Sequence, residues 1–275
     1  MKFLGRPAST QTIKMELELS TLIFMILIPR ITAESQPIPS NDLRVAAASD
    51  LTKPLREIAD KFETATGKKV VLIFGSSGLL KKQIENGAPF DVFASANEAY
   101  VDQLIAAKQA LQETKTLYAL GHIGIWTRLK GDLPKGLAGL LSPKYGKIAI
   151  ANPETAPYGK AAKEAMLKAK IWETLMPKLV YGENVLQAFQ FAKSGNADAA
   201  FISQSSAFDA NGGFYLLPEN LSPALRQSAA VLAASKQPEV AKSFLVFLTG
   251  KEGQSVLKKY GMSLPIRASV RKKGR

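Results

Sequence analysis

The chain has 275 residues, of which 46% are hydrophobic and 21% are charged, and this composition excludes an intrinsically disordered chain and a multi-span membrane protein. The net charge is +13, but residues 1–33 contribute +2 and the last nine residues contribute +5, which leaves +6 for residues 34–266. Such a surplus usually lies on a solvated surface, and the interleaved aromatic and basic residues of a single-strand nucleic-acid binder are missing. We therefore expect no nucleic-acid partner, and we interpret residues 267–275 as a solvated basic tail.

The N-terminal segment has the features of an export signal. Leu19–Ile28 is a run of ten uncharged, mostly apolar residues, whereas a membrane-spanning helix needs about twenty. Lys14 precedes this run, and Ile31-Thr32-Ala33 follows it as an acceptable cleavage site. The pattern predicts a cleavable signal peptide over residues 1–33.

Two alternatives to this interpretation remain open. Glu16 and Glu18 lie beside the apolar run, which is unusual for a signal peptide, so a buried N-terminal helix is the competing interpretation, and Met15 is a second possible start. Residues 34–42 then form a polar, proline-containing leader of the mature chain.

The sequence has no cysteine, so we expect no disulfide, no thiolate metal site and no lipid-modified cysteine. An exported chain of this kind is expected free in the periplasm or released.

From Leu43 onward, short apolar runs alternate with amphipathic stretches, a pattern typical of an α/β protein with parallel strands covered by helices. The pattern predicts strands at 44–48, 69–74, 91–94, 123–126, 148–151, 179–181, 199–202 and 229–233. It predicts helices at 52–65, 78–87, 98–108, 238–248 and 252–260, and Gly87 and Gly261 are expected to end two of them.

Small or hydroxyl residues separate a predicted strand from the start of a helix in four places. Backbone N–H groups and the positive end of a helix dipole would meet there, at the edge of a sheet where ligands bind in α/β proteins. For any single segment, the competing interpretation is an ordinary helix N-cap. An anion site therefore requires several of them to converge. The segments are Ala48-Ser49-Asp50, Gly75-Ser76-Ser77-Gly78, Ala156-Pro157-Tyr158-Gly159 and Glu183-Asn184-Val185.

The donors in these segments are neutral. A desolvated dianion needs several hydrogen bonds, and hydroxyls and amides supply them without the desolvation cost of a buried cation. Ser49 and Ser77 can supply hydroxyls. Tyr158 can supply its hydroxyl, its backbone N–H or a cover over the pocket, or it can be a partly buried aromatic residue near a turn.

Four runs in this order resemble the periplasmic molybdate-binding proteins of ABC transporters, and the resemblance extends over about Leu43 to Ser263. It implies a two-lobed type II periplasmic-binding fold hinged by two crossover strands, with lobe I at 43–120 plus 229–266 and lobe II at 121–228. The runs are VAAASDL (45–51), FGSSGLLKKQIENGAPFDVFASA (74–96), NPETAPYGKAAKEAM (152–166) and ENVLQAFQF (183–191).

The resemblance also implies the site and the partner. Ser49, Ser77, Tyr158 and the backbone of Val185 would contact the oxyanion, and Asp50 matches a position that contacts the ligand in some members. Some relatives carry a tyrosine donor where this chain has Ser203. Either Tyr158 takes over that role, or the site has one contact fewer.

The function expected from the resemblance is capture of molybdate, and of tungstate as well, by a periplasmic monomer that delivers the ion to an ABC permease. Molybdenum would be held as its oxyanion, with no protein ligand on the metal. We expect no cofactor and no catalysis.

A serine hydrolase is the alternative from another class of proteins. His122 is the only histidine and lies in an apolar run, and the sequence has neither a G-x-S-x-G nucleophile turn nor a phosphate-binding loop. Ser255 and Lys258 match S-x-x-K, a pattern short enough to arise by chance. The residues for catalysis are therefore incomplete.

A sulfate or phosphate binder of the same fold is the third possibility. Phosphate is partly protonated near neutral pH, so a carboxylate acceptor favours it and repels a fully ionised dianion. The orientation of Asp50 is the feature that bears on this choice.

Overall fold

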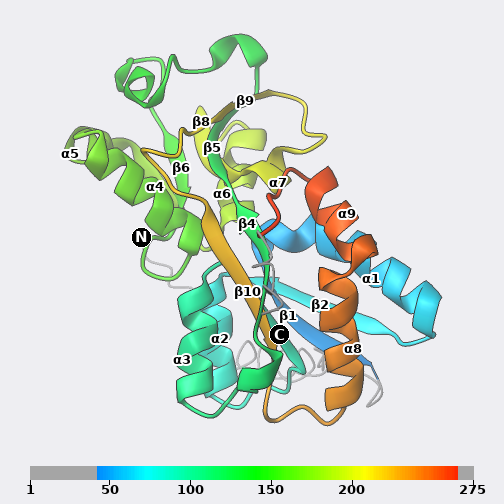
Figure 1. Cartoon of the computed structure of the whole chain (residues 1–275). Coiled ribbons are helices and arrows are strands. Elements are labelled where there is room, and N and C mark those ends of the chain that lie inside the picture. The colour runs from blue at the N-terminus through cyan, green and yellow to red at the C-terminus, as the bar shows by residue number, and fades with distance from the viewer. Residues whose placement is uncertain (1–41, 266–275) are drawn as a thin grey trace, which may run out of the picture. The chain divides into compact units, whose positions relative to one another are not determined.

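The structure is a computed structural model that describes residues 42–265, all within the unit Pro39–Arg275. The predicted signal peptide, most of the leader and the basic tail lie outside the described residues. Ten strands form two five-stranded sheets with helices around them (Figure 1). None of the helices within residues 42–265 is long and apolar enough to cross a membrane.

The first sheet has the strand order β2-β1-β3-β10-β4. Strands β1, β2 and β3 are parallel, and β10 is antiparallel to both of its neighbours. Its strands are β1 (Leu43–Ala48), β2 (Val70–Gly75), β3 (Val92–Ser95), β4 (Thr116–Gly121) and β10 (Leu225–Val231).

The second sheet has the order β7-β6-β8-β5-β9, with β6 parallel to β7 and β8, and β5 antiparallel to β8 and β9. Its strands are β5 (Ile123–Thr127), β6 (Ile148–Ala151), β7 (Leu179–Gly182), β8 (Ala199–Ser203) and β9 (Gly213–Leu216).

Nine α-helices are assigned within the described residues, and a short 3-10 helix, η1 (Ser49–Leu51), leads into the first of them. They are α1 (Thr52–Thr66), α2 (Ser77–Glu85), α3 (Glu98–Ala106), α4 (Pro157–Lys168), α5 (Trp172–Leu175), α6 (Val185–Lys193), α7 (Gln204–Ala207), α8 (Pro238–Thr249) and α9 (Lys251–Lys259).

Alternation along β1, an inner strand of the first sheet, explains why helices cover both faces of the sheet. Side chains of successive strand residues point to opposite faces. Leu43, Val45 and Ala47 belong to the core cluster that contains the apolar side of α1 and α8, whereas Ala46 belongs to the cluster beneath α2 and α3. Figure 1 shows α2 and α3 on one side of this sheet and α1 and α8 on the other.

The chain passes between the two sheets twice. His122 alone separates β4 from β5, and residues 217–224 return from β9 to β10. The late strand differs from its prediction, because it begins at Leu225 and ends at Val231 instead of covering 229–233. Leu225 is followed by three polar residues, Arg226 to Ser228, and these hid the pairing with β4 in the sequence. The predicted lobe boundaries themselves stay a prediction, since membership of a sheet does not define which residues move together.

The register of the parallel strands places their carboxyl ends together. Ala48 at the end of β1 pairs with Gly75 at the end of β2, and Ala151 at the end of β6 pairs with Gly182 at the end of β7. The helix starts that follow each pair of strands therefore lie next to each other.

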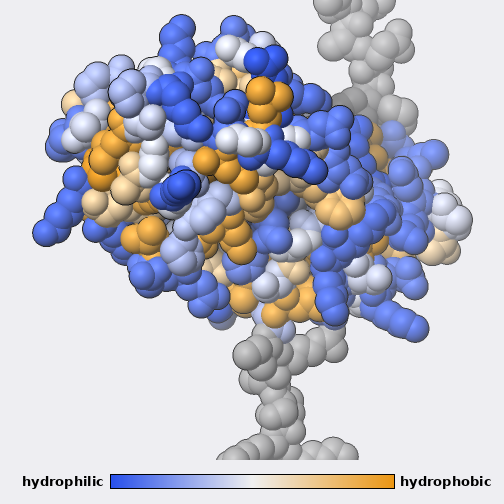
Figure 2. All heavy atoms as spheres, turned by 90° about the horizontal axis from the view of Figure 1, so that it is seen from above, coloured by the Kyte–Doolittle hydropathy of each residue, from blue (hydrophilic) through white to orange (hydrophobic). Residues whose placement is uncertain are grey.

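The view from above Figure 1 shows one face of the molecule. Hydrophilic side chains cover most of this face, and the apolar side chains form separate groups between them (Figure 2). Scattered apolar groups of this kind are normal on a protein surface.

Candidate functional site

One small cavity brings together the four helix starts singled out in the sequence. Its volume is about 10 Å³, close to the smallest space that holds a water molecule. The turn after β1 and the starts of α2, α4 and α6 all contribute to its wall. It is lined by Ala48, Ser49, Asp50, Gly75, Ser76, Ser77, Ala96, Ala156, Pro157, Tyr158, Asn184 and Val185.

All five residues predicted for the site are in this wall, and the convergence favours an anion site over four unrelated helix caps. Ser49 and Ser77 do not act as N-caps, and the residues at the N-cap positions of α2 and α4, Ser76 and Ala156, make no side-chain cap bond. None of the twelve lining residues is a lysine, arginine or histidine. The wall thus presents neutral donors to whatever enters it.

The first backbone N–H groups of a helix have no acceptor within the helix. Ser77 and Val185 are the first residues of α2 and α6, and Tyr158 is the second residue of α4. At α6, the Asn184 side chain accepts hydrogen bonds from the N–H groups of Leu186 and Gln187, both at 3.1 Å. The cap thus leaves the N–H of Val185 as the one directed at an incoming anion.

The two serine hydroxyls are buried and have protons to donate. Ser77 is 1% exposed, and its Oγ accepts a hydrogen bond from the N–H of Ala96 at 3.1 Å. That bond fixes the hydroxyl as an acceptor toward the protein and leaves its O–H for a ligand. Ser49 is 5% exposed, and its hydroxyl has no hydrogen-bond partner among residues 42–265.

Asp50 lies at the centre of a buried hydrogen-bond network. Its Oδ2 accepts from the Tyr158 hydroxyl at 2.9 Å and from Gln227 Nε2 at 2.6 Å, and Tyr118 donates to Gln227 Oε1 at 2.9 Å. Burial raises the pKa of Asp50 to about 6, against the lowering effect of the two side-chain hydrogen bonds. Asp50 Oδ1 is buried without a partner among the described residues.

This network shows which group of Tyr158 is free to bind a ligand. Its hydroxyl donates to Asp50, so its backbone N–H is the donor that remains for a ligand. Burial, with the neighbouring Asp50 carboxyl, raises the pKa of Tyr158 well above its ordinary value. Gln227 was missed in the sequence, because the predicted late strand began two residues after it. The one available signal was a polar residue leading into an apolar run.

Comparison with known proteins shows the family to which the chain belongs. The profile of the family described as bacterial extracellular solute-binding protein matches residues 43–263. The chain belongs to this solute-binding family. The predicted resemblance is confirmed by the molybdate-binding protein ModA of Azotobacter vinelandii, which is 34% identical over 81% of this chain and 90% of its own. ModA of Rhodobacter capsulatus is 35% identical over 82% and 89%.

The fold is confirmed by solved structures. The periplasmic molybdate-binding protein of Azotobacter vinelandii has a TM-score of 0.78 and 29% identity, and the match covers 82% of this chain and all of that one. A sulfate-binding protein of Mycobacterium tuberculosis has a TM-score of 0.71 at 14% identity, covering 83% of this chain and 88% of that one, and it shows likeness of fold alone. The two sheets connected by two crossings are therefore the two-lobed arrangement of the periplasmic-binding fold.

Ser203 does not line the cavity of this solute-binding protein. It is fully buried at the end of β8, and its Oγ accepts from the N–H of Ser206 at 3.1 Å as the N-cap of α7. The neighbouring Ser205 hydroxyl donates to the backbone carbonyl of Asp50 at 2.8 Å. Ser203 thus packs behind the Asp50 turn and adds no donor to the cavity.

A larger pocket adjoins the anion cavity and shares Ser49 and Asp50 with it. Its volume is about 360 Å³, and it lies between α1, α6 and the segment after α7. Lys53 and Lys193 line it together with Asp209. The Lys53 ammonium donates to the carbonyl of Phe208, and burial lowers the pKa of this lysine. Lys53 and Lys193 thus line this outer pocket and not the smaller cavity.

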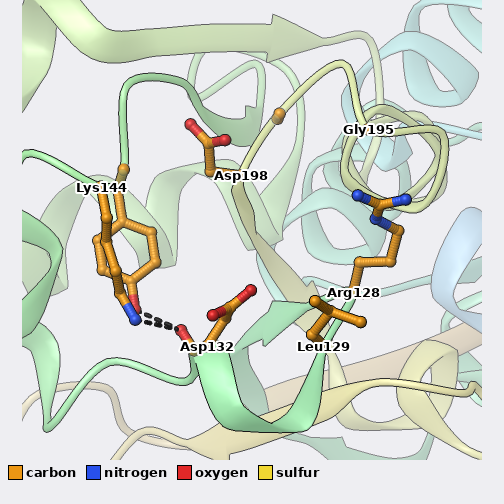
Figure 3. A pocket seen from close by; sticks show the side chains of 8 residues that line it. Arg128, Leu129, Asp132, Lys144, Gly195 and Asp198 are labelled. Carbon is orange, nitrogen blue, oxygen red and sulfur yellow. Dashed lines mark hydrogen bonds between the residues drawn. The ribbon is translucent and has the colours of Figure 1, made fainter.

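A third pocket, of about 150 Å³, contains none of the predicted site residues (Figure 3). Several of its polar groups already have partners: Tyr145 and Lys144 donate to the carbonyl of Asp132, and Asp198 accepts from the N–H groups of Gly146 and Lys147 at 2.8 Å each. The Lys144 ammonium and the Asp198 carboxylate are thus engaged in holding the local loops together.

The candidate residues for hydrolysis do not form a site. His122 Nε2 lies 2.7 Å from Ser263 Oγ, but no carboxylate contacts the His122 ring within residues 42–265. Ser255 and Lys258 lie on α9, outside the anion cavity. A nucleophile oriented by a base and a third group is not assembled here.

Proposed function

We propose that this chain captures molybdate or tungstate in the cavity between the four helix starts and delivers the ion to an ABC permease, without catalysis and without a cofactor. The observation that carries the proposal is the convergence of Ser49, Ser77, Tyr158 and Val185 on one cavity whose lining includes no cation. The similarity to the molybdate-binding proteins of Azotobacter and Rhodobacter supports molybdate as the ion.

The donor set suits a small, fully ionised oxyanion. The hydroxyls of Ser49 and Ser77 and the N–H groups of Tyr158 and Val185 provide four hydrogen bonds that can reach different oxygens of a tetrahedral ion. Neutral donors compensate the lost hydration of the ion without adding a buried charge of their own. In this arrangement molybdenum is surrounded by its own oxygens and has no protein ligand.

Closure would enclose the ion. The carbonyl oxygen of Thr155, which precedes α4, accepts hydrogen bonds from the Ser76 hydroxyl at 2.5 Å and from the N–H of Gly78 at 2.9 Å. These bonds join the first sheet's α2 to the second sheet's α4, next to the cavity. We propose that they form as the lobes close, and that the closed monomer is the form that docks on the permease.

Isothermal titration of the purified chain with molybdate, tungstate, sulfate and phosphate tests the ligand. We expect tight binding of molybdate and tungstate and weak or no binding of the other two. Submicromolar binding of sulfate without heat from molybdate would overturn the assignment. Export is tested separately, by fractionation of expressing cells and N-terminal sequencing of the periplasmic product, which we expect to begin at Glu34.

A further inference from the structure

The two carboxylate oxygens of Asp50 have different surroundings. Oδ2 accepts the hydrogen bonds from Tyr158 and Gln227, whereas Oδ1 is buried and has no partner within residues 42–265. Buried polar atoms without a partner are rare in folded proteins. Asp50 lines the anion cavity, so an anion bound there can supply the partner that this oxygen lacks.

The protonation state of Asp50 decides whether that contact is attractive. An ionised carboxylate has only acceptor oxygens and repels a dianion, but a protonated carboxyl group has one O–H to donate. Because Oδ2 already accepts two hydrogen bonds, the proton belongs on Oδ1. Burial raises the pKa of Asp50 to about 6, and a dianion alongside raises it further, because like charges disfavour ionisation.

The hydrogen bonds from Gln227 and Tyr158 lower the pKa of Asp50, but burial outweighs them, and no neighbouring group titrates in its place. The pKa values of Tyr158 on α4 and Tyr118 on β4 are raised well above their ordinary values, so both stay neutral donors. From β10 and α7 the contacts are the neutral side chains of Gln227 and Ser205. Lys53 of α1, Lys193 of α6 and Asp209 after α7 line the outer pocket and not the anion cavity.

We propose that Asp50 binds the oxyanion as a neutral carboxylic acid that donates a hydrogen bond from Oδ1, so that one proton enters the site with each dianion. The proton comes from the solvent through Asp50 and returns there when the ion leaves. This inference rests on the proposed function, because it requires an oxyanion in the cavity.

The mechanism also separates two kinds of ion. A fully ionised dianion such as molybdate or sulfate needs the proton from Asp50. A hydrogen phosphate ion carries its own proton and can donate it to an ionised Asp50, without uptake from solvent. The ion's affinity for protons therefore becomes part of its recognition.

Titration calorimetry with molybdate measures the proton directly. The observed enthalpy is compared in two buffers of different ionisation enthalpy, Hepes and Tris, at pH 7.5. We expect uptake of about one proton per ion, and about tenfold weaker binding for each pH unit above 7. At pH 5.5 Asp50 is already protonated in most molecules of the free protein, so proton uptake falls well below one half per ion.

Asp50→Asn is the decisive variant, because an amide keeps one acceptor for Tyr158 and Gln227 and one donor for the ion. We expect it to bind with no proton uptake and with an affinity that is independent of pH from 5.5 to 8.5. Asp209→Asn is the matched control. Asp209 lines the outer pocket with φ of +55°, a conformation that asparagine tolerates. It should keep the uptake of the unmodified chain.

If the observed enthalpy of molybdate binding is the same in both buffers at pH 7.5, the inference is overturned and the proposed function still stands. The same measurement decides the point if Asp50→Asn does not fold. Loss of proton uptake in Asp209→Asn would also overturn it, because the proton would then belong to the outer pocket. If no oxyanion gives heat with the unmodified chain at any pH, the proposed function fails, and the inference falls with it.

Discussion

The backbone N–H of Gly78, at the start of α2, donates a 2.9 Å hydrogen bond to the carbonyl oxygen of Thr155 before α4. A Cβ atom on Gly78 would lie 2.5 Å from that oxygen. Such a contact is too short for any real pair of these atoms, and the obstacle is backbone, which cannot move aside as a flexible side chain can. The approach of the two lobes at this point therefore requires glycine.

Gly78→Ala is expected to weaken oxyanion binding at least tenfold while leaving the unfolding temperature of the free protein unchanged or slightly raised. The methyl group keeps the lobes apart, whereas alanine is the better helix former within α2. Calorimetry and thermal unfolding give the two readouts. Gly131→Ala is the control, because a Cβ there has no atom within 4 Å. Unchanged affinity in Gly78→Ala would show that this contact is not part of the binding form.

Ser49→Ala and Ser77→Ala are each expected to weaken binding by about 1–3 kcal/mol, because each removes a donor and leaves a ligand oxygen unpaired. Their effects on folding should differ. Ser77→Ala also removes the acceptor of the Ala96 N–H, so it should lower the free energy of unfolding by roughly 1 kcal/mol. Ser49→Ala leaves no protein group unpaired. Denaturant unfolding without ligand measures the effect on folding, and calorimetry measures the effect on binding. If the variants bind as tightly as the unmodified chain, these hydroxyls do not contact the ion.

Asn184→Asp tests the charge requirement of the cavity. Aspartate caps a helix about as well as asparagine, so the stability of α6 should be kept. The new carboxylate stands in the cavity wall, where it should repel a dianion and weaken binding tenfold or more. Asn184→Ser, a neutral cap, is the control and should bind within a fewfold of the unmodified chain. Equal affinity of the aspartate and serine variants would contradict a site built for dianions.

The raised pKa of Asp50 predicts a pH-dependent stability. A carboxyl whose pKa is higher in the folded than in the unfolded chain stabilises the fold when protonated, and this contribution is lost as the pH rises from 3.8 to about 6. The shift corresponds to about 3 kcal/mol. Relative to Asp50→Asn, the unmodified chain should therefore lose about that much unfolding free energy between pH 4 and pH 7. The free energy of unfolding is measured in urea at four pH values for both proteins. If it changes with pH in the same way in both, the pKa of Asp50 is not raised in the folded chain.

The sequence by itself determined the α/β class, most of the strands, and the helix starts that carry the site. These depend on local features: apolar β-branched runs at strand positions, amphipathic spacing in α1, and small polar residues where a strand gives way to a helix. The late strand was only partly found, since the polar start of β10 gives no apolar alternation to follow.

Only the tertiary structure decided which donors face the cavity. Ser49 and Ser77 could each have been a helix cap; Ser77 is instead fixed by the N–H of Ala96, which follows β3 and lies 19 residues away. The Tyr158 hydroxyl is taken by Asp50, 108 residues distant, and Gln227 joins them from β10. Hydrogen bonds between segments so far apart depend on how the sheets are ordered and how the lobes meet. Local sequence preferences carry no information about either.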